Sequence, residues 1–318
     1  MTRIREIKTT FTAGEVSADL LGRSDLRAYD NGALKLRNVF INPTGGVTRR
    51  AGLAYIDTVA GSGRLISFEF NTEQTYLLVI TAGRIDVYFQ GIKQADLAAP
   101  WTQEQISSIA WTQSADTLLL VHPQLSPMKL TRSQNGSWQL TEWRFFTEDE
   151  IIYQPYFKFA DSAVTLTPSG TSGTITVSAS AAVFSQLHEG TRLRITGREV
   201  VISDYESPTV VTAEVIQTLA STSPVIDWAE QAFSPVRGYP ANVAFHQDRL
   251  VIGGSRDLPN RLWFSASGDL FNFDLGAGLD DQAIEFAILS DQVNAIRGMF
   301  SGRHLQVFTS GAEWMLTG

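Results

Sequence analysis

The residue types that most often carry chemistry are sparse in this chain. The four histidines, His122, His188, His246 and His304, have no second histidine or carboxylate at the spacing of a zinc site. The chain has no cysteine, which excludes disulfides, thiolate metal ligands and cysteine nucleophiles. It contains neither the Gly-x-Ser-x-Gly nucleophile motif nor a P-loop. We therefore expect no catalytic residue, no metal ligand and no cofactor, and we expect that the protein is not an enzyme.

Two short segments are candidate exceptions to the absence of a catalytic or metal-binding site. Asp280 and Asp281, with Glu285 close behind, follow the glycine-containing segment 276–279 (GAGL) and could offer oxygen ligands to a cation. The EF-hand pattern is absent, so solvated carboxylates are the favoured interpretation. Residues 265–271 (SASGDLF) resemble the Asp-box turns of sialidase propellers. Those turns are structural in sialidases, so the match predicts a hairpin and not an enzyme.

Carbohydrate chemistry is the other possibility that the composition raises. Trp111, Trp138, Trp143, Trp263 and Trp314 could form a sugar-binding platform, but they lie in or beside predicted strands. Filling of the core is therefore their favoured role. A glycosidase also needs two facing carboxylates, and among 33 Asp and Glu residues the sequence singles out no pair.

The elements that would position any site are strand pairs that recur four times. In each pair an apolar segment is followed by a turn and then by a second strand segment, typical of a β-propeller or a similar repeated sheet. The four pairs are 77–80 (LLVI) with 85–88 (IDVY), 118–121 (LLLV) with 128–131 (MKLT), 250–253 (LVIG) with 262–265 (LWFS), and 305–308 (LQVF) with 314–317 (WMLT). Ala82-Gly83 is the predicted hairpin turn of the first pair, and Asn135-Gly136 is the clearest hairpin signal of the second unit, 106–146.

The spacing of these pairs predicts blades with a module inserted among them. Leu77 and Leu118 are 41 residues apart and Leu250 and Leu305 are 55 apart, close to the roughly 40–50 residues of a four-stranded blade. Leu118 and Leu250 are 132 residues apart, which is too long for one blade. Short alternating segments at 164–167, 174–178, 192–195 and 209–216 predict strands in the intervening stretch.

We predict a mainly all-β chain with β-propeller-like repeated antiparallel sheets, an inserted small β-barrel or sandwich, and a short N-terminal helix. The predicted parts are an N-terminal arm with a short helix (1–60), propeller-like blades (61–156), the inserted small β-barrel (157–222), and further blades (223–318). The helix is predicted from Ser24, as N-cap, to Val39. Residues 228–235 (WAEQAFSP) are predicted as helix or loop. The last strand runs to the C-terminus, so we expect a longer protein or a sheet that a partner completes.

Charge is divided unevenly along the chain. Residues 1–60 carry nine Lys and Arg against six Asp and Glu, whereas the remaining 258 carry sixteen against twenty-seven. The acidic body argues against wrapping nucleic acid by phosphate neutralisation. The basic arm could dock on an acidic partner, although solvated charge is the favoured interpretation. No apolar segment is long enough to span a membrane and the N-terminus lacks a secretory signal, so we expect synthesis in the cytosol.

Several segments resemble one known family. Residues 11–17 (FTAGEVS), 21–26 (LGRSDL), with Tyr29 and Asn38, and 45–52 (GGVTRRAG) are similar to the opening of the tail tubular or nozzle proteins of short-tailed bacteriophages and prophages. Residues 240–254 (PANVAFHQDRLVIGG) and 263–273 (WFSASGDLFNF) are similar to a stretch common in that family. The inserted segment resembles the FCCH-type domain of ubiquitin-activating enzymes. No ubiquitin chemistry follows, because the chain has no cysteine.

The resemblance implies a structural virion protein in the phage tail, made in the cytoplasm of the bacterial host. It implies a homo-oligomeric ring of six copies, with a monomer in isolation as an alternative, docked to the adaptor and portal and to tail fibre proteins. DNA would pass through the channel without specific binding. Candidate subunit-interface residues in the arm are Phe11, Glu15, Arg23, Arg49 and Arg50.

Two other classes stay open at this stage. The chain could be a β-propeller that binds or cleaves carbohydrate of the bacterial envelope, which a cleft with two close carboxylates and exposed tryptophans would favour. It could also be a cytosolic propeller adaptor for protein partners, for which the sequence offers no specific support. Large lateral surfaces and a mobile arm would favour the nozzle.

Overall fold

The computed structural model describes residues 7–20, 22–289 and 294–317. The chain divides into two compact units, Met1–Asp57 and Thr58–Gly318. Nearly all regular elements in both are β-strands, which confirms the predicted all-β class. No helix in the described part of the chain is long and apolar enough to cross a membrane.

The N-terminal unit consists of short elements joined by turns. A two-stranded parallel pair joins β1 to β2, and an antiparallel hairpin joins β3 to β4. The turn of this hairpin begins at Asn42, where the Gly45 amide donates to the Asn42 carbonyl oxygen at 2.9 Å. The elements are β1 (Gly14–Glu15), the 3-10 turn η1 (Ala18–Leu20), α1 (Arg27–Asp30), β2 (Gly32–Ala33), β3 (Val39–Ile41) and β4 (Val47–Arg49).

The predicted helix from Ser24 to Val39 is wrong in its extent. Helix α1 has four residues and its N-cap is Leu26, not Ser24. Gly32 leaves the helix and pairs with Gly14, and a Cβ at Gly32 would lie 2.4 Å from the Val16 side chain. A helix this short needs tertiary packing to be stable, and no residue of α1 is buried.

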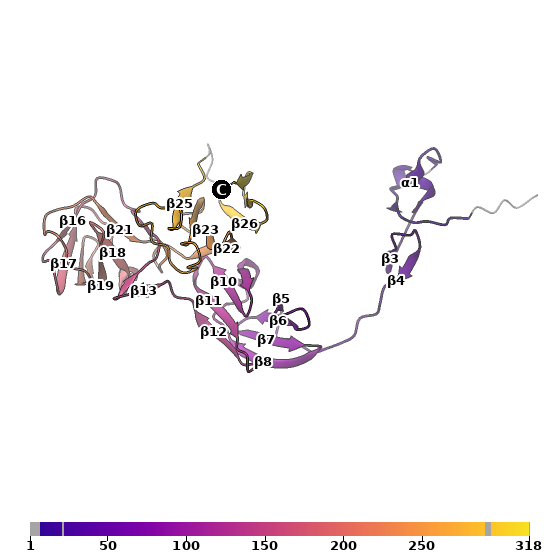
Figure 1. Ribbon diagram of the computed structural model, residues 1–318, viewed down its shortest axis with the longest axis horizontal. Helices are drawn as coiled ribbons and strands as arrows, with labels where there is room; N and C mark the ends of the chain where they lie inside the picture. The colour runs from indigo at the N-terminus through magenta and orange to yellow at the C-terminus, as the bar shows by residue number, and fades with distance from the viewer. Residues whose placement is uncertain (1–6, 21, 290–293, 318) are drawn as a thin grey trace, which may run out of the picture. The chain divides into compact units, whose positions relative to one another are not determined.

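The body is built on four antiparallel meanders, in which each strand pairs with the next (Figure 1). Three of them have four strands and the last has three. The first is β5 (Arg64–Glu69), β6 (Thr75–Thr81), β7 (Arg84–Phe89) and β8 (Ile92–Ala98). The second is β9 (Ala110–Ser114), β10 (Thr117–His122), β11 (Leu125–Arg132) and β12 (Trp138–Glu142), preceded by the 3-10 turn η2 (Ile106–Ser108). The third is β22 (Pro240–His246), β23 (Arg249–Ser255), β24 (Arg261–Phe264) and β25 (Ile284–Ala287), and the fourth is β26 (Ile296–Ser301), β27 (Leu305–Thr309) and β28 (Glu313–Leu316).

All four strand pairs found in the sequence are neighbouring antiparallel strands. They are β6–β7, β10–β11, β23–β24 and β27–β28. The two predicted hairpin turns are also present, and their glycines, Gly83 and Gly136, have φ of 71° and 86°. An amino acid with a Cβ adopts such angles at a cost, which explains glycine at these two turns.

Successive meanders pack through shared apolar clusters. One cluster joins the first and second sheets around Phe68 and Leu118, another joins the second and third around Val121 and Trp263, and another joins the third and fourth around Leu305. Each of these sheets presents alternate residues to a neighbour, as the two-residue period of a strand requires. This packing resembles that of propeller blades, as the repeats predict.

The tryptophans take the core role that the sequence favours. Trp143 and Trp263 are buried, and Trp111, Trp138 and Trp314 are partly buried against the clusters. Trp101, which was not singled out from the sequence, is also buried.

The chain between the second and third meanders forms a separate seven-stranded sheet with its own core, which lies to the left of them in Figure 1. Its edges curl toward each other, because Leu166 and Val225 form an antiparallel bridge that links β16 to the segment before β21. Its strands are β15 (Tyr156–Phe157), β16 (Leu166–Pro168), β17 (Thr174–Ala179), β18 (Arg192–Ile195), β19 (Arg198–Ser207), β20 (Val210–Val215) and β21 (Trp228–Gln231), with the 3-10 turn η3 (Gln186–His188). A small two-stranded sheet, β13 (Thr147–Glu148) with β14 (Ile151–Ile152), precedes it.

The prediction of helix or loop at 228–235 is wrong for its first four residues. They form β21, whose Trp228 and Glu230 alternate as buried residues. β21 pairs with both β15 and β18, so the sheet imposes the strand on a segment with little strand propensity of its own.

A buried carboxylate fastens the inserted sheet to the strand before it. Glu199 is fully buried on β19, where Oε2 accepts from Arg192 Nη1 at 2.8 Å and Oε1 accepts from Arg194 Nη2 at 3.0 Å. Oε2 also accepts from the Ile152 amide of β14 at 3.3 Å. Two arginines and a backbone donor together satisfy a charge that would otherwise be costly to bury.

The repeated leucines give a direct test of the sheet packing. Leu118, Leu250 and Leu305 are 0% exposed, whereas Leu77, at the same place in the first repeat, is 37% exposed. We expect alanine at each of the first three to lower the free energy of unfolding by about 3 kcal/mol, because a cavity replaces a packed side chain. Leu77→Ala, the matched control, should cost less than about 1 kcal/mol. Denaturation followed by tryptophan fluorescence measures this, and equal losses at all four sites would contradict the packing.

The Glu199 cluster gives a second test. Glu199→Gln should lower the free energy of unfolding of the inserted sheet by about 3 kcal/mol, because two arginines lose their shared buried counter-charge. Glu214→Gln, on the neighbouring strand β20 but exposed, is the matched control and should change it by less than about 0.5 kcal/mol. Hydrogen exchange of β18 and β19 amides reports the loss locally. Equal protection in the two variants would contradict a stabilising role for the cluster.

Candidate functional site

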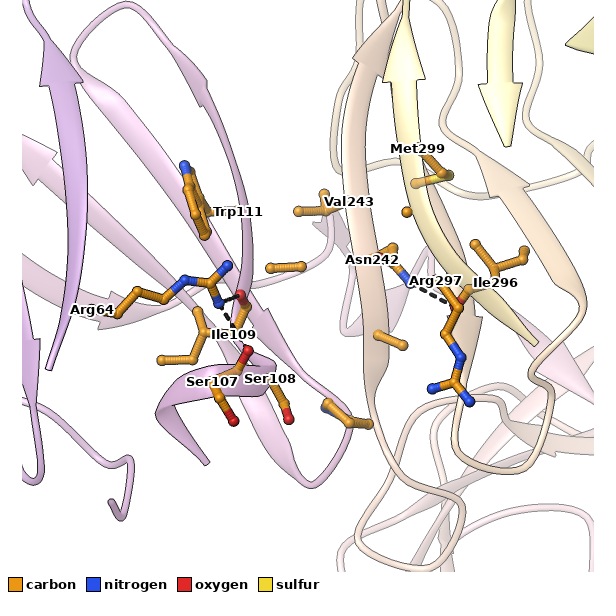
Figure 2. A pocket seen from close by; sticks show the side chains of 14 residues that line it. Arg64, Ser107, Ser108, Ile109, Trp111, Asn242, Val243, Ile296, Arg297 and Met299 are labelled. Carbon is orange, nitrogen blue, oxygen red and sulfur yellow. Dashed lines mark hydrogen bonds between the residues drawn. The ribbon is translucent and has the colours of Figure 1, made fainter. Parts of the chain in front are cut away.

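The first strands of the four meanders meet at one cavity. It has a volume of about 450 Å³ and is lined by Arg64 of β5, by β9, by β22 and by β26 (Figure 2). We call it the hub pocket. Its lining residues are Arg64, Ser107, Ser108, Ile109, Ala110, Trp111, Pro123, Ala241, Asn242, Val243, Ile296, Arg297, Gly298 and Met299.

One wall of the hub pocket is organised around Arg64. Its Nη1 donates to the carbonyl oxygen of Ser107 in η2 at 3.1 Å and to that of Ile109, the residue after η2. The guanidinium carbon lies 4.4 Å from the centre of the Trp111 ring, a cation–π arrangement. Burial lowers the pKa of Arg64, since the charged form is partly removed from water. Carbonyl dipoles and an aromatic face therefore hold this side chain in place.

The opposite wall comes from the third and fourth sheets. Asn242 of β22 donates through Nδ2 to the carbonyl oxygen of Ile296 at 3.0 Å, which joins β22 to β26 across the wall (Figure 2). Met299 of β26 packs close to Gly253 of β23, where a Cβ would lie 2.6 Å from its Sδ. Arg297 is exposed on β26. The packing of these sheets thus sets the shape of the pocket.

The charge of the lining is opposite to that of the body. Among the described residues that line the hub pocket there are two arginines and no Asp or Glu, whereas Thr58–Gly318 carries twenty-seven acidic and sixteen basic residues. Because the lining also has no histidine, it offers no general acid or base of the usual kind. The chemistry that the hub pocket supports is binding, with a preference for negative charge.

The structure keeps the predicted interface residues together in the N-terminal unit. Arg23 pairs with Asp25 at 2.8 Å, and Glu15 Oε1 accepts from the Leu36 amide at 2.7 Å. The amide of Phe11 donates to the Gly45 carbonyl at 2.8 Å. Arg49 and Arg50 are exposed at the end of β4, and their guanidinium groups form no ion pair with the described residues. Their role as interface residues stays a prediction.

The other sequence candidates behave as ordinary structural residues. Glu285 pairs with Arg261, and burial nevertheless raises the pKa of Glu285. Asp280 and Asp281 are exposed, and within 7–20, 22–289 and 294–317 no three His, Cys, Asp or Glu side chains are grouped to hold a metal. The Asp-box-like segment forms a tight turn, as predicted, in which Ala266 and Asp269 make a bridge.

The sequence alone does not indicate that the residues of the hub pocket form one site. Arg64 and Trp111 are 47 positions apart, and Asn242 and Arg297 are farther along the chain. No local pattern links them, because only the packing of four sheets brings their strands to one place. The predicted core role of Trp111 holds in part, because it packs against the cluster around Phe68 and Leu118 and also lines the pocket.

Comparison with known proteins adds little to the geometry. No family model and no curated protein matches the chain. Among solved structures, the β-propeller domain of Cps50 (Swd1) from Myceliophteria thermophila is similar at 11% sequence identity, over 76% of this chain and 80% of that one, with a TM-score of 0.21. So low a TM-score carries no argument, and the fold rests on the sheets themselves.

Two buried histidines predict how stability depends on pH. Burial lowers the pKa of His122, whose Nδ1 accepts from the Gln124 amide at 3.2 Å, and burial also lowers the pKa of His246. Unfolded histidine titrates near about 6.5. Below that pH the unfolded state binds more protons than the folded state, so stability falls as the pH falls.

We expect the free energy of unfolding to drop by at most about 1 kcal/mol for each of His122 and His246 between about pH 6.5 and 5.5. His122→Asn keeps a hydrogen-bond acceptor but cannot titrate, so it should remove part of this dependence. Urea denaturation at a series of pH values measures the slope. A variant with the same slope as the wild-type protein would contradict the assignment.

Proposed function

We propose that the chain is a structural subunit of a phage-type tail nozzle, with no catalytic activity. In this proposal the sheets of the body form the wall of a ring of six copies around a channel. The resemblance of the N-terminal and third-repeat segments to tail nozzle proteins is its starting point. One structural observation supports it most, namely the state of the N-terminal unit.

The described residues of the N-terminal unit, 7–20 and 22–57, form no apolar core of their own. Among its described residues only Gly32 and Gly45 are buried. Large apolar side chains stay in solvent, including Leu34, Leu53 and Tyr55, which are 67%, 88% and 79% exposed. A segment that buries so little apolar surface cannot offset the conformational entropy of its order. Contact with another protein would supply the missing burial, as expected of an arm that fastens subunits together.

Charge indicates what the arm would contact. Residues 1–60 carry a net charge of about +3 and the rest of the chain about −11, so the arm of one copy is complementary to the body of another. Arg49 and Arg50 are free of ion pairs with the described residues and fit this role. Arm-to-body contact is heterologous, and such contacts close into a ring when the rotation between copies permits.

The same charge distribution suits a channel for DNA. A wall with excess negative charge repels the phosphate backbone and weakens binding to it. DNA would then pass without specific recognition. In this proposal the protein resides in the tail of the virion and docks on the adaptor and portal through the ring.

The envelope-carbohydrate alternative is less well supported. The tryptophans that a sugar platform would use, such as Trp143 and Trp263, are buried between sheets. The hub pocket also lacks the pair of carboxylates that glycoside hydrolysis needs.

The proposal predicts that assembly depends on the arm. Light scattering and negative-stain microscopy of the chain, alone and mixed with the neighbouring tail proteins, should show six-fold rings. Reversal of charge in Arg49→Glu with Arg50→Glu should raise the concentration needed for assembly by about tenfold or more, because the arm would repel the acidic body.

The matched control is Arg144→Glu with Arg303→Glu, which changes the net charge equally at exposed positions of the body. It should assemble like the wild-type protein if the arm is the docking element. A chain that remains monomeric with every tail partner, or an arm variant that assembles like the wild type, would contradict the proposal.

A further inference from the structure

We infer that the hub pocket is a binding site for a small oxyanion, a phosphate or carboxylate ligand that Arg64 contacts directly. This goes beyond a structural role in a ring, because it gives the body a ligand of its own. The ligand would lie among the first strands of four sheets, so its binding would also stabilise their arrangement.

Arg64 has N–H donors that the described chain does not use. A guanidinium has five N–H donors. The hydrogen bonds that Arg64 makes within the described chain all leave from Nη1, to the carbonyl oxygens of Ile106, Ser107 and Ile109. Nε and Nη2 therefore remain for a ligand. A carboxylate or phosphate matches the planar fork of an arginine better than any neutral group.

Arg64 is held in position before any ligand binds. Three carbonyl oxygens fix one end of the guanidinium and the Trp111 ring lies against it at 4.4 Å. An arginine that is already ordered loses little conformational entropy on binding. Arg64 also has no ion pair with the described carboxylates, so a ligand would not have to displace an acidic side chain.

The other residues that line the hub pocket add polar groups, positive charge and apolar contact. Ser107 and Ser108 lie on the same wall as Arg64 (Figure 2). The Ser107 hydroxyl donates to the Glu104 carbonyl oxygen at 3.5 Å, which leaves the exposed hydroxyl group of Ser108 as a donor for an anion. Arg297, on the opposite wall, adds long-range attraction. Val243 and Met299 add apolar contact for a carbon skeleton.

The volume and the charge of the hub pocket favour a compact anion. The volume of about 450 Å³ lies within the usual range for small-molecule sites. No described lining residue is acidic, which favours an anion, whereas the acidic body around the pocket disfavours a long polyanion such as nucleic acid. A compact anion satisfies both conditions.

Isothermal titration with inorganic phosphate and with citrate, at constant ionic strength in chloride, tests the inference. We expect saturable binding of at least one of them with a dissociation constant of about 1 mM or tighter. Binding of phosphate alone would assign the site to phosphate ligands, and binding of citrate alone would assign it to carboxylates.

The decisive variant is Ser108→Glu, which adds a competing carboxylate beside Arg64 at an exposed position. It should weaken binding by about tenfold or more, while the isosteric control Ser108→Gln should stay within about twofold. Arg297→Gln should weaken binding by about threefold, and Arg303→Gln, exposed on the same sheet but outside the lining, should not.

Circular dichroism of each variant checks that the fold is retained, and none of these substitutions removes a buried side chain. No saturable binding of either anion to the wild-type protein would overturn the inference. Equal affinities of Ser108→Glu and Ser108→Gln would also overturn it, because the anion would then bind elsewhere on the surface.

Discussion

The arrangement of the body depends on the apolar packing of one β-sheet against the next. Leu118, Val121 and Leu305 lie in three different clusters, and each cluster joins two successive meanders. Hydrogen bonds hold each meander together internally, and single side-chain bonds, such as that from Asn242 to the Ile296 carbonyl oxygen, cross between sheets. Burial of alternate residues makes the main connection, and it contributes roughly 25 cal/mol for each Å² of apolar surface removed from water. The position of every first strand, and therefore of the hub pocket, follows from this packing.

The N-terminal unit shows what happens where such packing is missing. It has turns, a hairpin and local ion pairs, yet its apolar residues remain exposed. The inserted sheet shows the opposite case, since it has a full core and an additional buried cluster at Glu199. The N-terminal unit is therefore suited to association, whereas the inserted sheet is a module that is stable through its own contacts. The proposed role of the arm rests on this difference.

Local patterns predicted the strands and turns well, and non-local effects account for the failures. The leucine repeats and Asn135-Gly136 encode strand pairs and a turn within a few residues, so the sequence alone revealed them. Helix α1 is far shorter than predicted because Gly32 pairs with Gly14 instead of continuing the helix. β21 became a strand because β15 and β18 flank it. Arg64 could not be identified as a site residue, since its partners come from other sheets.

In the proposed assembly the arm gains its burial from another subunit, and hydrogen–deuterium exchange tests this most directly. Amides of residues 7–20 and 22–57 should exchange rapidly in the isolated chain and become protected when it assembles with the proposed tail proteins. Amides of β10 and β23, which lie inside the body, should be protected equally in both states. An arm that is already protected in isolation, or one that stays unprotected in the assembly, would contradict the account.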